Sequence, residues 1–336
     1  MSDPAHIDGK YRVLQRLGQG GYGTVYLCKS NDFEKNVAVK VLRRHDGDDL
    51  QTKRFLNEVK ALGKCSHPGI IQVHRFSVTT DGASLYYVMD ALNGRSLSHE
   101  LETNGPLTPR RLIKIFSQVF DALEHAHGYG IVHRDVKPSN IMLTLNEQGE
   151  EQAVLIDFGI MRASSPDVRL TATGDMLGTP SYMSPEQCQG TVADFRSDLY
   201  STGCTIYEAA TGRPPFEGDS YAILLDHMNN LPSNVPEYLN GFLQICMAKD
   251  RTARFASAKD AENALVEIGE SAILDVRVPD EKNSQSPLKL FSKPRHITIA
   301  LCIAGLVSIA AFCGFSVLRQ QNATEPAPNT TATQMQ

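Results

Sequence analysis

Short apolar runs separated by turn residues dominate the first part of the chain. Their alternation and their content of β-branched and aromatic residues are typical of strands. One stretch, Gln51–Gly63, instead repeats apolar residues at helical spacing. The expected strands are Tyr11–Leu17, Thr24–Lys29, Asn36–Val41, Ile70–Val78 and Ser84–Met89.

Helical periodicity takes over from Arg110 onward. Leu112–Gly128 repeats apolar residues at intervals of three and four, and another long helical stretch begins near Ser197. This order predicts an α+β protein in which a small β-rich lobe is followed by a larger helical lobe.

The chain changes character after the helical part. Residues 269–296 are polar and interrupted by prolines, which is typical of a linker. The predicted division is an N-terminal extension at 1–10, a globular domain at 11–268, the linker at 269–296, an apolar segment at 297–318 and a polar tail at 319–336.

The apolar segment Ile297–Leu318 contains no charged residue. As a helix it would extend about 33 Å, enough to cross the hydrocarbon core of a membrane, so we expect a single transmembrane helix. Lys289, Lys293 and Arg295 precede it, which places the globular part on the cytoplasmic side of a cell membrane. A buried core helix is the alternative explanation of this segment.

Composition and charge exclude several classes of protein. Apolar residues make up 41% of the chain and charged residues 21%, as in globular proteins. The net charge of -5 gives no reason to expect nucleic-acid binding. The cysteines form no C-x-x-C pair, so neither a zinc site nor a redox pair is indicated, and scattered thiols fit a reducing compartment.

A glycine-rich turn lies between the first two expected strands and contains Gly18, Gly20 and Gly23. Glycines allow a backbone to approach phosphates closely, so that its N–H groups can hydrogen-bond the phosphate oxygens. A dinucleotide-binding turn would lead into a helix, whereas Thr24–Leu27 has the composition of a strand. An ordinary hairpin is the alternative.

Lys40 closes the strand-like run Val37–Lys40, directly after the glycine turn. An ion pair with Glu58, on the helix expected next, would hold its ammonium group against nucleotide phosphates. Each residue alone is explained equally well as a solvated surface charge, and a surface salt bridge contributes little to stability.

The most specific pattern is His133–Asn140, which reads His-Arg-Asp-Val-Lys-Pro-Ser-Asn. Asp157-Phe158-Gly159 follows, with Asp157 seventeen residues after Asn140. The two carboxylates, Asp135 and Asp157, and the carboxamide of Asn140 supply between them a base and two oxygen ligands for magnesium, a hard cation.

With these motifs in this order, the chain resembles the eukaryotic-type (Hanks-type) serine/threonine protein kinases, and most closely their bacterial, membrane-anchored members. The resemblance covers about residues 11–268. It implies the bilobal protein kinase fold, with ATP bound between a β-rich N-lobe and a helical C-lobe. The implied activity is transfer of the ATP γ-phosphate to serine and threonine hydroxyls of protein substrates, with Mg²⁺, or Mn²⁺ in its place.

The resemblance also implies a role for each motif residue. The implied roles are phosphate binding by Gly18, Gly20, Gly23 and Lys40, support of Lys40 by Glu58, orientation of the substrate hydroxyl by Asp135, charge neutralisation by Lys137, and magnesium binding by Asn140 and Asp157. For the adenine pocket it implies a roof of Leu17, Val25 and Ala38, a floor of Met142, a gatekeeper at Met89, and backbone contacts from Asp90 and Leu92. Ordinary core packing is the alternative for the apolar members.

The predicted activation segment, residues 157–186, carries further expectations. By resemblance, the Thr179 hydroxyl would bridge Asp135 and Lys137, a feature of serine/threonine rather than tyrosine kinases. Glu186 would pair with Arg254. Thr171 and Thr173 are the candidates for autophosphorylation, because a phosphate there could bind Arg134 and order the segment. Solvated loop residues are the alternative for both threonines.

Small residues at Ala300, Ala304 and Ser308 would permit close packing of two membrane helices, and thus a homodimer. Small residues that simply face lipid are the alternative. For the globular part, two rival functions remain: a membrane-tethered pseudokinase without turnover, and a kinase that acts on small molecules or lipids. The complete set Lys40, Glu58, Asp135, Asn140 and Asp157 argues against the first, and the Thr179 region against the second.

Overall fold

The computed structural model describes residues 3–20, 23–32, 35–43, 57, 59–159 and 180–275, with side chains through residue 270. Contacts divide the chain into two units, Met1–Val278 and Pro279–Gln336, and every described residue belongs to the first. The segment 297–318, predicted to cross a membrane, therefore lies outside the described residues. Within the described part of the chain, no helix has the length and apolar character needed to span a membrane.

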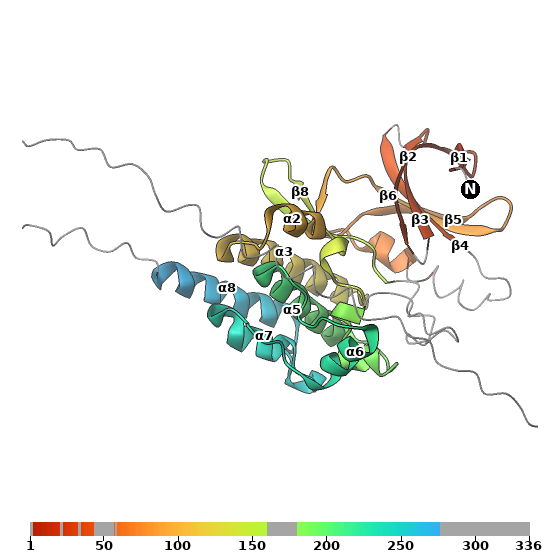
Figure 1. The fold of residues 1–336 in the computed structure, drawn as a ribbon. Coiled ribbons are helices and arrows are strands. Elements are labelled where there is room, and N and C mark those ends of the chain that lie inside the picture. The colour runs from red at the N-terminus through yellow and green to blue at the C-terminus, as the bar shows by residue number, and fades with distance from the viewer. Residues whose placement is uncertain are drawn as a thin grey trace, which may run out of the picture. The chain divides into compact units, whose positions relative to one another are not determined.

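Six antiparallel strands form the sheet of the N-lobe, in the order β1-β2-β3-β4-β6-β5 (Figure 1). The strands are β1 (His6–Ile7), β2 (Tyr11–Gly20), β3 (Gly23–Ser30), β4 (Asn36–Arg43), β5 (Val73–Val78) and β6 (Ser84–Asp90). Each strand expected from the sequence is present, and the sheet has one more, because β1 pairs with β2 in a stretch that was assigned to an N-terminal extension.

The two faces of this sheet bury separate apolar groups, because successive residues of a strand point to opposite faces. One face contributes Ala38, Tyr87 and Met89 to the main hydrophobic core. The other face forms a second cluster, which contains Val37 and Tyr86. Tyr86 and Tyr87 are therefore neighbours in sequence whose side chains lie on opposite faces of β6.

The turn after β1 is tied to the sheet by side-chain hydrogen bonds. Asp8 has a left-handed backbone conformation, with φ of +51°, which aspartate tolerates better than most residues. One oxygen of its carboxylate accepts hydrogen bonds from the hydroxyl of Thr80 and, at 2.9 Å, from the N–H of Thr80. The other oxygen accepts the hydroxyl of Tyr86 at 2.9 Å. These bonds hold β1 against β6 and the loop that precedes it.

A helix packs against the inner face of the sheet, at residues 57 and 59–64. Val59 and Leu62 are buried in the main core, as the apolar spacing of the expected helix requires. Glu58, the predicted partner of Lys40, lies outside the described residues.

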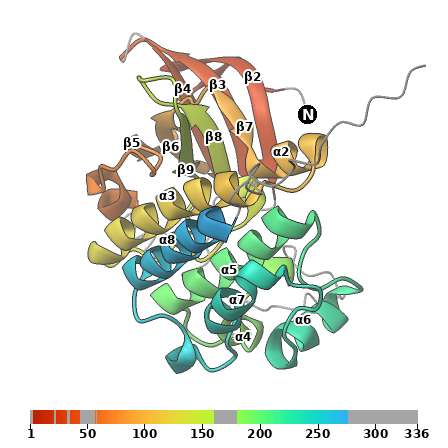
Figure 2. The same ribbon diagram turned by 90° about the vertical axis from the view of Figure 1, so that its left-hand side faces the viewer.

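The C-lobe is helical, as predicted, and also contains a small sheet in the order β7-β8-β9. Its helices α3 and α8 lie side by side, and α5 packs against α3 (Figure 2). The strands are β7 (Gly94–Ser96), β8 (Ile141–Leu145) and β9 (Glu151–Leu155), and the helices are α2 (Leu97–Asn104), α3 (Pro109–Gly128), α4 (Pro185–Cys188), α5 (Phe195–Thr211), α6 (Ser220–Asn229), α7 (Asn240–Cys246) and α8 (Ala258–Asp275). Single 3-10 turns occur at η1 (Pro138–Asn140), η3 (Pro180–Tyr182), η4 (Glu237–Leu239) and η5 (Arg251–Ala253).

The last helix corrects one predicted boundary. The linker was expected to begin at residue 269, but α8 continues to Asp275. Gly269, the first residue of the predicted linker, lies inside the helix, where an added Cβ would come within 3.0 Å of the Ile113 side chain on α3. The glycine therefore permits close packing of α3 and α8. In a single sequence, a glycine required for helix packing looks the same as a glycine at a helix end.

Candidate active site

The glycine turn joins β2 to β3, and its last pair is Gly20 opposite Gly23. A Cβ at Gly23 would lie 2.2 Å from the carbonyl oxygen of Val41 on β4, so only glycine fits there. At Gly18 and Gly20, by contrast, no atom of the described residues lies within 4 Å of an added Cβ, so these positions leave space beside the backbone.

Lys40, on β4, forms an ion pair with Asp157 of the Asp-Phe-Gly motif. The lysine side chain is largely buried, with 14% of its surface exposed, so this is not an ordinary surface charge. The hydroxyl of Tyr87 also donates to the same carboxylate, at 3.3 Å. The N-lobe sheet therefore supplies two donors to a carboxylate that follows β9 of the C-lobe.

The predicted catalytic loop, residues 133–140, brings three polar side chains together. The ammonium group of Lys137 lies 2.9 Å from Oδ2 of Asp135. The side-chain amide of Asn140 donates to the same Oδ2 at 3.1 Å and to the backbone carbonyl of Asp135 at 2.8 Å. The Asp135 carboxylate is thus oriented by its neighbours while 19% of its side-chain surface stays exposed.

A buried carboxylate on α5 fixes the backbone of this loop. Asp198 is fully buried and accepts the N–H groups of His133 and Arg134 at 2.8 and 2.7 Å. It also contacts Nε2 of His127, at 2.8 Å. Arg134 has a left-handed conformation with φ of +62°, which a non-glycine residue keeps only when its surroundings hold it. Asp198 supplies that restraint, so it acts on the site through the backbone.

His133 connects the catalytic loop to the Asp-Phe-Gly motif. Its Nε2 donates to the carbonyl of Ile156 at 3.1 Å, and its Nδ1 accepts the N–H of Asp135 at 3.3 Å. These bonds require the neutral ring, in agreement with burial, which lowers the pKa of His133. The ring also packs against buried Phe158, with centroids 4.4 Å apart.

Asn140 and Asp157 lie on paired backbone segments, because the N–H of Ile156 donates to the Asn140 carbonyl at 2.9 Å. The Asn140 amide nitrogen is committed to Asp135, which leaves the side-chain oxygen as the atom that could bind a cation. A carboxylate plus an amide oxygen suits Mg²⁺ that is bound mainly through phosphates. In the described residues no cluster of three or more His, Cys, Asp or Glu side chains could hold a metal ion by itself.

Five of the residues predicted to surround adenine belong to or pack against the main core. Ala38 pairs with Met89 across β4 and β6, and both are buried in the main core. Val25, Leu92 and Met142 are partly buried against the same core. Leu17, near the end of β2, is 51% exposed and does not belong to this core. The carboxylate of Asp90 contacts Lys35 and His74, each at 2.8 Å, so only its backbone could meet a nucleotide base.

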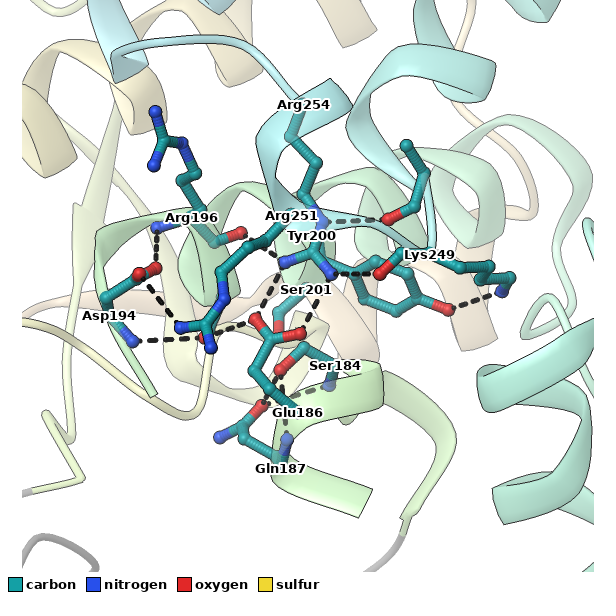
Figure 3. A network of polar contacts seen from close by, with 12 residues as sticks. Ser184, Glu186, Gln187, Asp194, Arg196, Tyr200, Ser201, Lys249, Arg251 and Arg254 are labelled. Carbon is teal, nitrogen blue, oxygen red and sulfur yellow. Dashed lines mark hydrogen bonds and ion pairs between the residues drawn. The ribbon is translucent and has the colours of Figure 1, made fainter. Parts of the chain in front are cut away.

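The predicted pair Glu186–Arg254 is present and buried (Figure 3). Two parallel hydrogen bonds of 2.7 and 2.8 Å join the carboxylate and guanidinium groups, whose side chains are 6% and 0% exposed. Ser197 donates to the same carboxylate at 2.6 Å. Burial alone would raise the pKa of Glu186, but the bonds and charge of Arg254 outweigh it and bring the pKa to about 2.

Helix α4, which carries Glu186, connects the end of the predicted activation segment to the catalytic loop. Ser184 caps α4 with a capping box that also uses the side chain of Gln187. The amide of Gln187 donates to the backbone carbonyl of Arg134 at 3.0 Å. Ser184 is therefore a helix cap, and α4 lies directly against the loop that carries Asp135.

Several predicted residues cannot be placed. Glu58, Thr171, Thr173 and Thr179 all lie outside the described residues. The sequence did not predict a role for Tyr87, Gln187 or Lys249. Tyr87 contacts Asp157, Gln187 contacts the catalytic loop, and Lys249 lies among the buried residues of the C-lobe beside Arg254. Lys249 donates to the Tyr200 hydroxyl at 3.0 Å and to the carbonyl of His227 at 2.9 Å, and burial lowers its pKa to about 8 (Figure 3). No local motif marks any of the three, because each acts through a tertiary contact.

Comparison with known proteins identifies similar chains throughout the described region. Residues 11–265 match the protein kinase domain family. The serine/threonine-protein kinase PknB of Mycolicibacterium smegmatis is 35% identical over 287 residues, which cover 82% of this chain and 45% of that protein. PknB of Mycobacterium tuberculosis H37Rv is 34% identical over 316 residues, or 92% of this chain and 49% of that protein. The chain thus spans less than half the length of these relatives.

A solved kinase domain has a fold similar to that of this chain. The crystal structure of the Mycobacterium tuberculosis PknI kinase domain superposes with a TM-score of 0.63 and 27% sequence identity. The match covers 80% of this chain and 100% of that domain. The β-rich N-lobe and helical C-lobe are therefore those of a bilobal kinase fold.

Proposed function

Because this chain belongs to the protein kinase domain family, we propose that it transfers the γ-phosphate of ATP to serine and threonine hydroxyls of proteins. One observation carries the proposal: four motif residues are linked in series. Lys40 contacts Asp157, the N–H of the preceding Ile156 donates to the Asn140 carbonyl, and the Asn140 side chain donates to Asp135. An ammonium group, the two side chains proposed to bind a cation and the proposed base are thus brought together.

Positioning and electrostatics account for the chemistry. Lys40 would bind the α- and β-phosphates beneath the glycine turn. Asp135, held by Lys137 and Asn140, would orient the substrate hydroxyl and accept its proton, and Lys137 would then balance charge on the transferring phosphate. Asn140 and Asp157 would hold Mg²⁺, or Mn²⁺ in its place, and the ion would supply positive charge beside the transferring phosphate.

Radiolabelled ATP, Mg²⁺ and a generic protein substrate test this proposal directly. We expect label on serine and threonine of the substrate and none on tyrosine, and Asp135→Asn should reduce it at least about a hundredfold, the usual contribution of a general base. The same assay tests autophosphorylation, which we propose at Thr171 or Thr173, by mass mapping of the kinase. Equal labelling by wild type and Asp135→Asn would contradict the proposal.

The assay also separates the rival functions. Nucleotide binding without transfer to any substrate would indicate a pseudokinase scaffold. Transfer to lipids or small metabolites but not to proteins would indicate a kinase of another substrate class. Phosphate found only at sites outside residues 157–186 would refute the proposed autophosphorylation.

We also propose that the chain is a single-pass membrane protein with its kinase domain in the cytoplasm, anchored by 297–318, and that this helix supports a homodimer. After fractionation, the full chain should sediment with membranes and a variant ending at residue 296 should stay in the supernatant. Equal recovery of both proteins in the supernatant would contradict the anchor. Cross-linking of full chains in membranes, compared with an Ala300→Leu/Ala304→Leu variant, tests the dimer.

A further inference from the structure

We propose that the hydroxyl of Tyr87 is a positioning group for Asp157, which it helps to hold in the orientation that binds a metal–nucleotide complex. The inference rests on the proposed function, since Asp157 matters only if the site binds such a complex. It concerns a tyrosine that no motif of the sequence singles out.

The pairing of two strands brings the tyrosine to the site. Lys40 on β4 lies directly opposite Tyr87 on β6 in the antiparallel ladder. Side chains of directly opposed residues point to the same face of a sheet, so both lie on the face that contributes Ala38 and Met89 to the main core. Both donate to the same oxygen, Oδ1 of Asp157, and the tyrosine bond is 3.3 Å long.

The Tyr87 hydroxyl is buried and therefore needs a hydrogen-bond partner inside the protein. Tyr87 is 4% exposed, and a buried hydroxyl without a hydrogen bond is costly. The Asp157 carboxylate accepts from this hydroxyl at 3.3 Å, so the buried donor has an acceptor in the site.

The two donors restrict how the carboxylate can turn. With Oδ1 engaged by Lys40 and Tyr87, Oδ2 is the oxygen left to face a cation. The backbone of Asp157 is also in the left-handed region, with φ of +61°, so its conformation depends on its contacts. Phe158 anchors the motif on one side, against His133, and Tyr87 restrains it on the other.

The adjacent tyrosine provides a matched control. Tyr86 is also buried, but its hydroxyl faces the opposite side of the sheet and donates to Asp8 at 2.9 Å. Tyr86→Phe and Tyr87→Phe each remove one buried hydroxyl bonded to an aspartate, from neighbouring positions of one strand. Only the second removes a contact to Asp157.

Calorimetry should measure ADP affinity in Mg²⁺ and, separately, in EDTA for wild type and both variants. We expect Tyr87→Phe to weaken binding of Mg-ADP about fivefold, the effect of one long hydrogen bond to a charged group, and to leave metal-free ADP binding unchanged. Tyr86→Phe should match wild type under both conditions. Tyr87→Met provides a second variant without the hydroxyl, should the phenylalanine variant fail to fold.

Each other outcome overturns the inference. Unchanged or tighter Mg-ADP binding by Tyr87→Phe would show that the hydroxyl does not support the metal-binding orientation. Equal weakening with and without metal would indicate a general structural effect. Absence of any nucleotide binding by wild type would reject the proposed function itself, and this inference with it.

Discussion

Replacing Asp157 with alanine should lower kcat for phosphoryl transfer by at least about a thousandfold. The change removes the carboxylate proposed to bind Mg²⁺, and metal stabilisation of transition-state charge contributes several kcal/mol, where 1.36 kcal/mol is a factor of ten. It also leaves Lys40 and Tyr87 without the acceptor that they share in this structure. Steady-state rates with a peptide substrate and saturating ATP measure the effect.

Comparison with Asp135→Asn separates the two aspartates by role. Both variants should have little activity, but only Asp157→Ala should lose the preference for Mg-ADP over metal-free ADP, because Asp135 is proposed to act on the substrate hydroxyl. If Asp157→Ala retained wild-type turnover, or if both variants bound Mg-ADP equally well, the assignment of Asp157 to the metal would be wrong.

Breaking the buried pair Glu186–Arg254 should have the largest effect on stability. Arg254→Met leaves a buried carboxylate without its partner, and loss of one member of a buried ion pair costs about 3–5 kcal/mol. For a domain of this size we expect Tm to fall by about 10 °C. The double variant Glu186→Gln/Arg254→Met should lose less than the sum of the two single variants, since it leaves no unpaired charge.

An exposed pair provides the control. Lys259 and Glu262 lie 2.7 Å apart on α8, with the lysine side chain 54% exposed, so Lys259→Met should leave Tm close to that of wild type. Differential scanning calorimetry measures Tm for Arg254→Met, Glu186→Gln, their double variant and Lys259→Met. An equal, small shift for Arg254→Met and Lys259→Met would show that the buried pair is not a stabilising element.

The pH dependence of stability follows from the same pair. The pKa of Glu186 is about 2 in the folded protein and higher when unfolded, so its contribution is complete above the unfolded value of about 4.5. That contribution is lost as pH falls from about 4.5 toward 2. Between pH 5 and pH 3, wild type should therefore lose more stability than Glu186→Gln does.

Local patterns in the sequence predicted most of the fold. Apolar periodicity predicted strands β2 to β6 and helices α3 and α5. This periodicity reflects the burial of one face of an element, and it can be recognised without knowing which other elements that face packs against. The catalytic loop and the Asp-Phe-Gly motif were found for a different reason. Their chemistry requires several residue types at fixed spacing, so the pattern is specific even in one sequence.

What the sequence did not predict depends on contacts between distant segments. Tyr87 becomes notable only once the ladder places it opposite Lys40. Gln187 matters because α4 packs on the catalytic loop, and Gly269 because α8 packs on α3. Register and helix packing decide each case, and neither is visible in the local composition of one chain.

The N-terminal strand has a practical consequence for protein production. The family match begins at residue 11, so an expression fragment cut at that boundary would omit His6, Ile7 and Asp8. The exposed edge of β2 would then offer unpaired backbone groups to other molecules, which favours aggregation. Tyr86 would lose its acceptor in the same cut. Crystallisation and assay fragments should therefore start before the strand, at residue 3 or earlier.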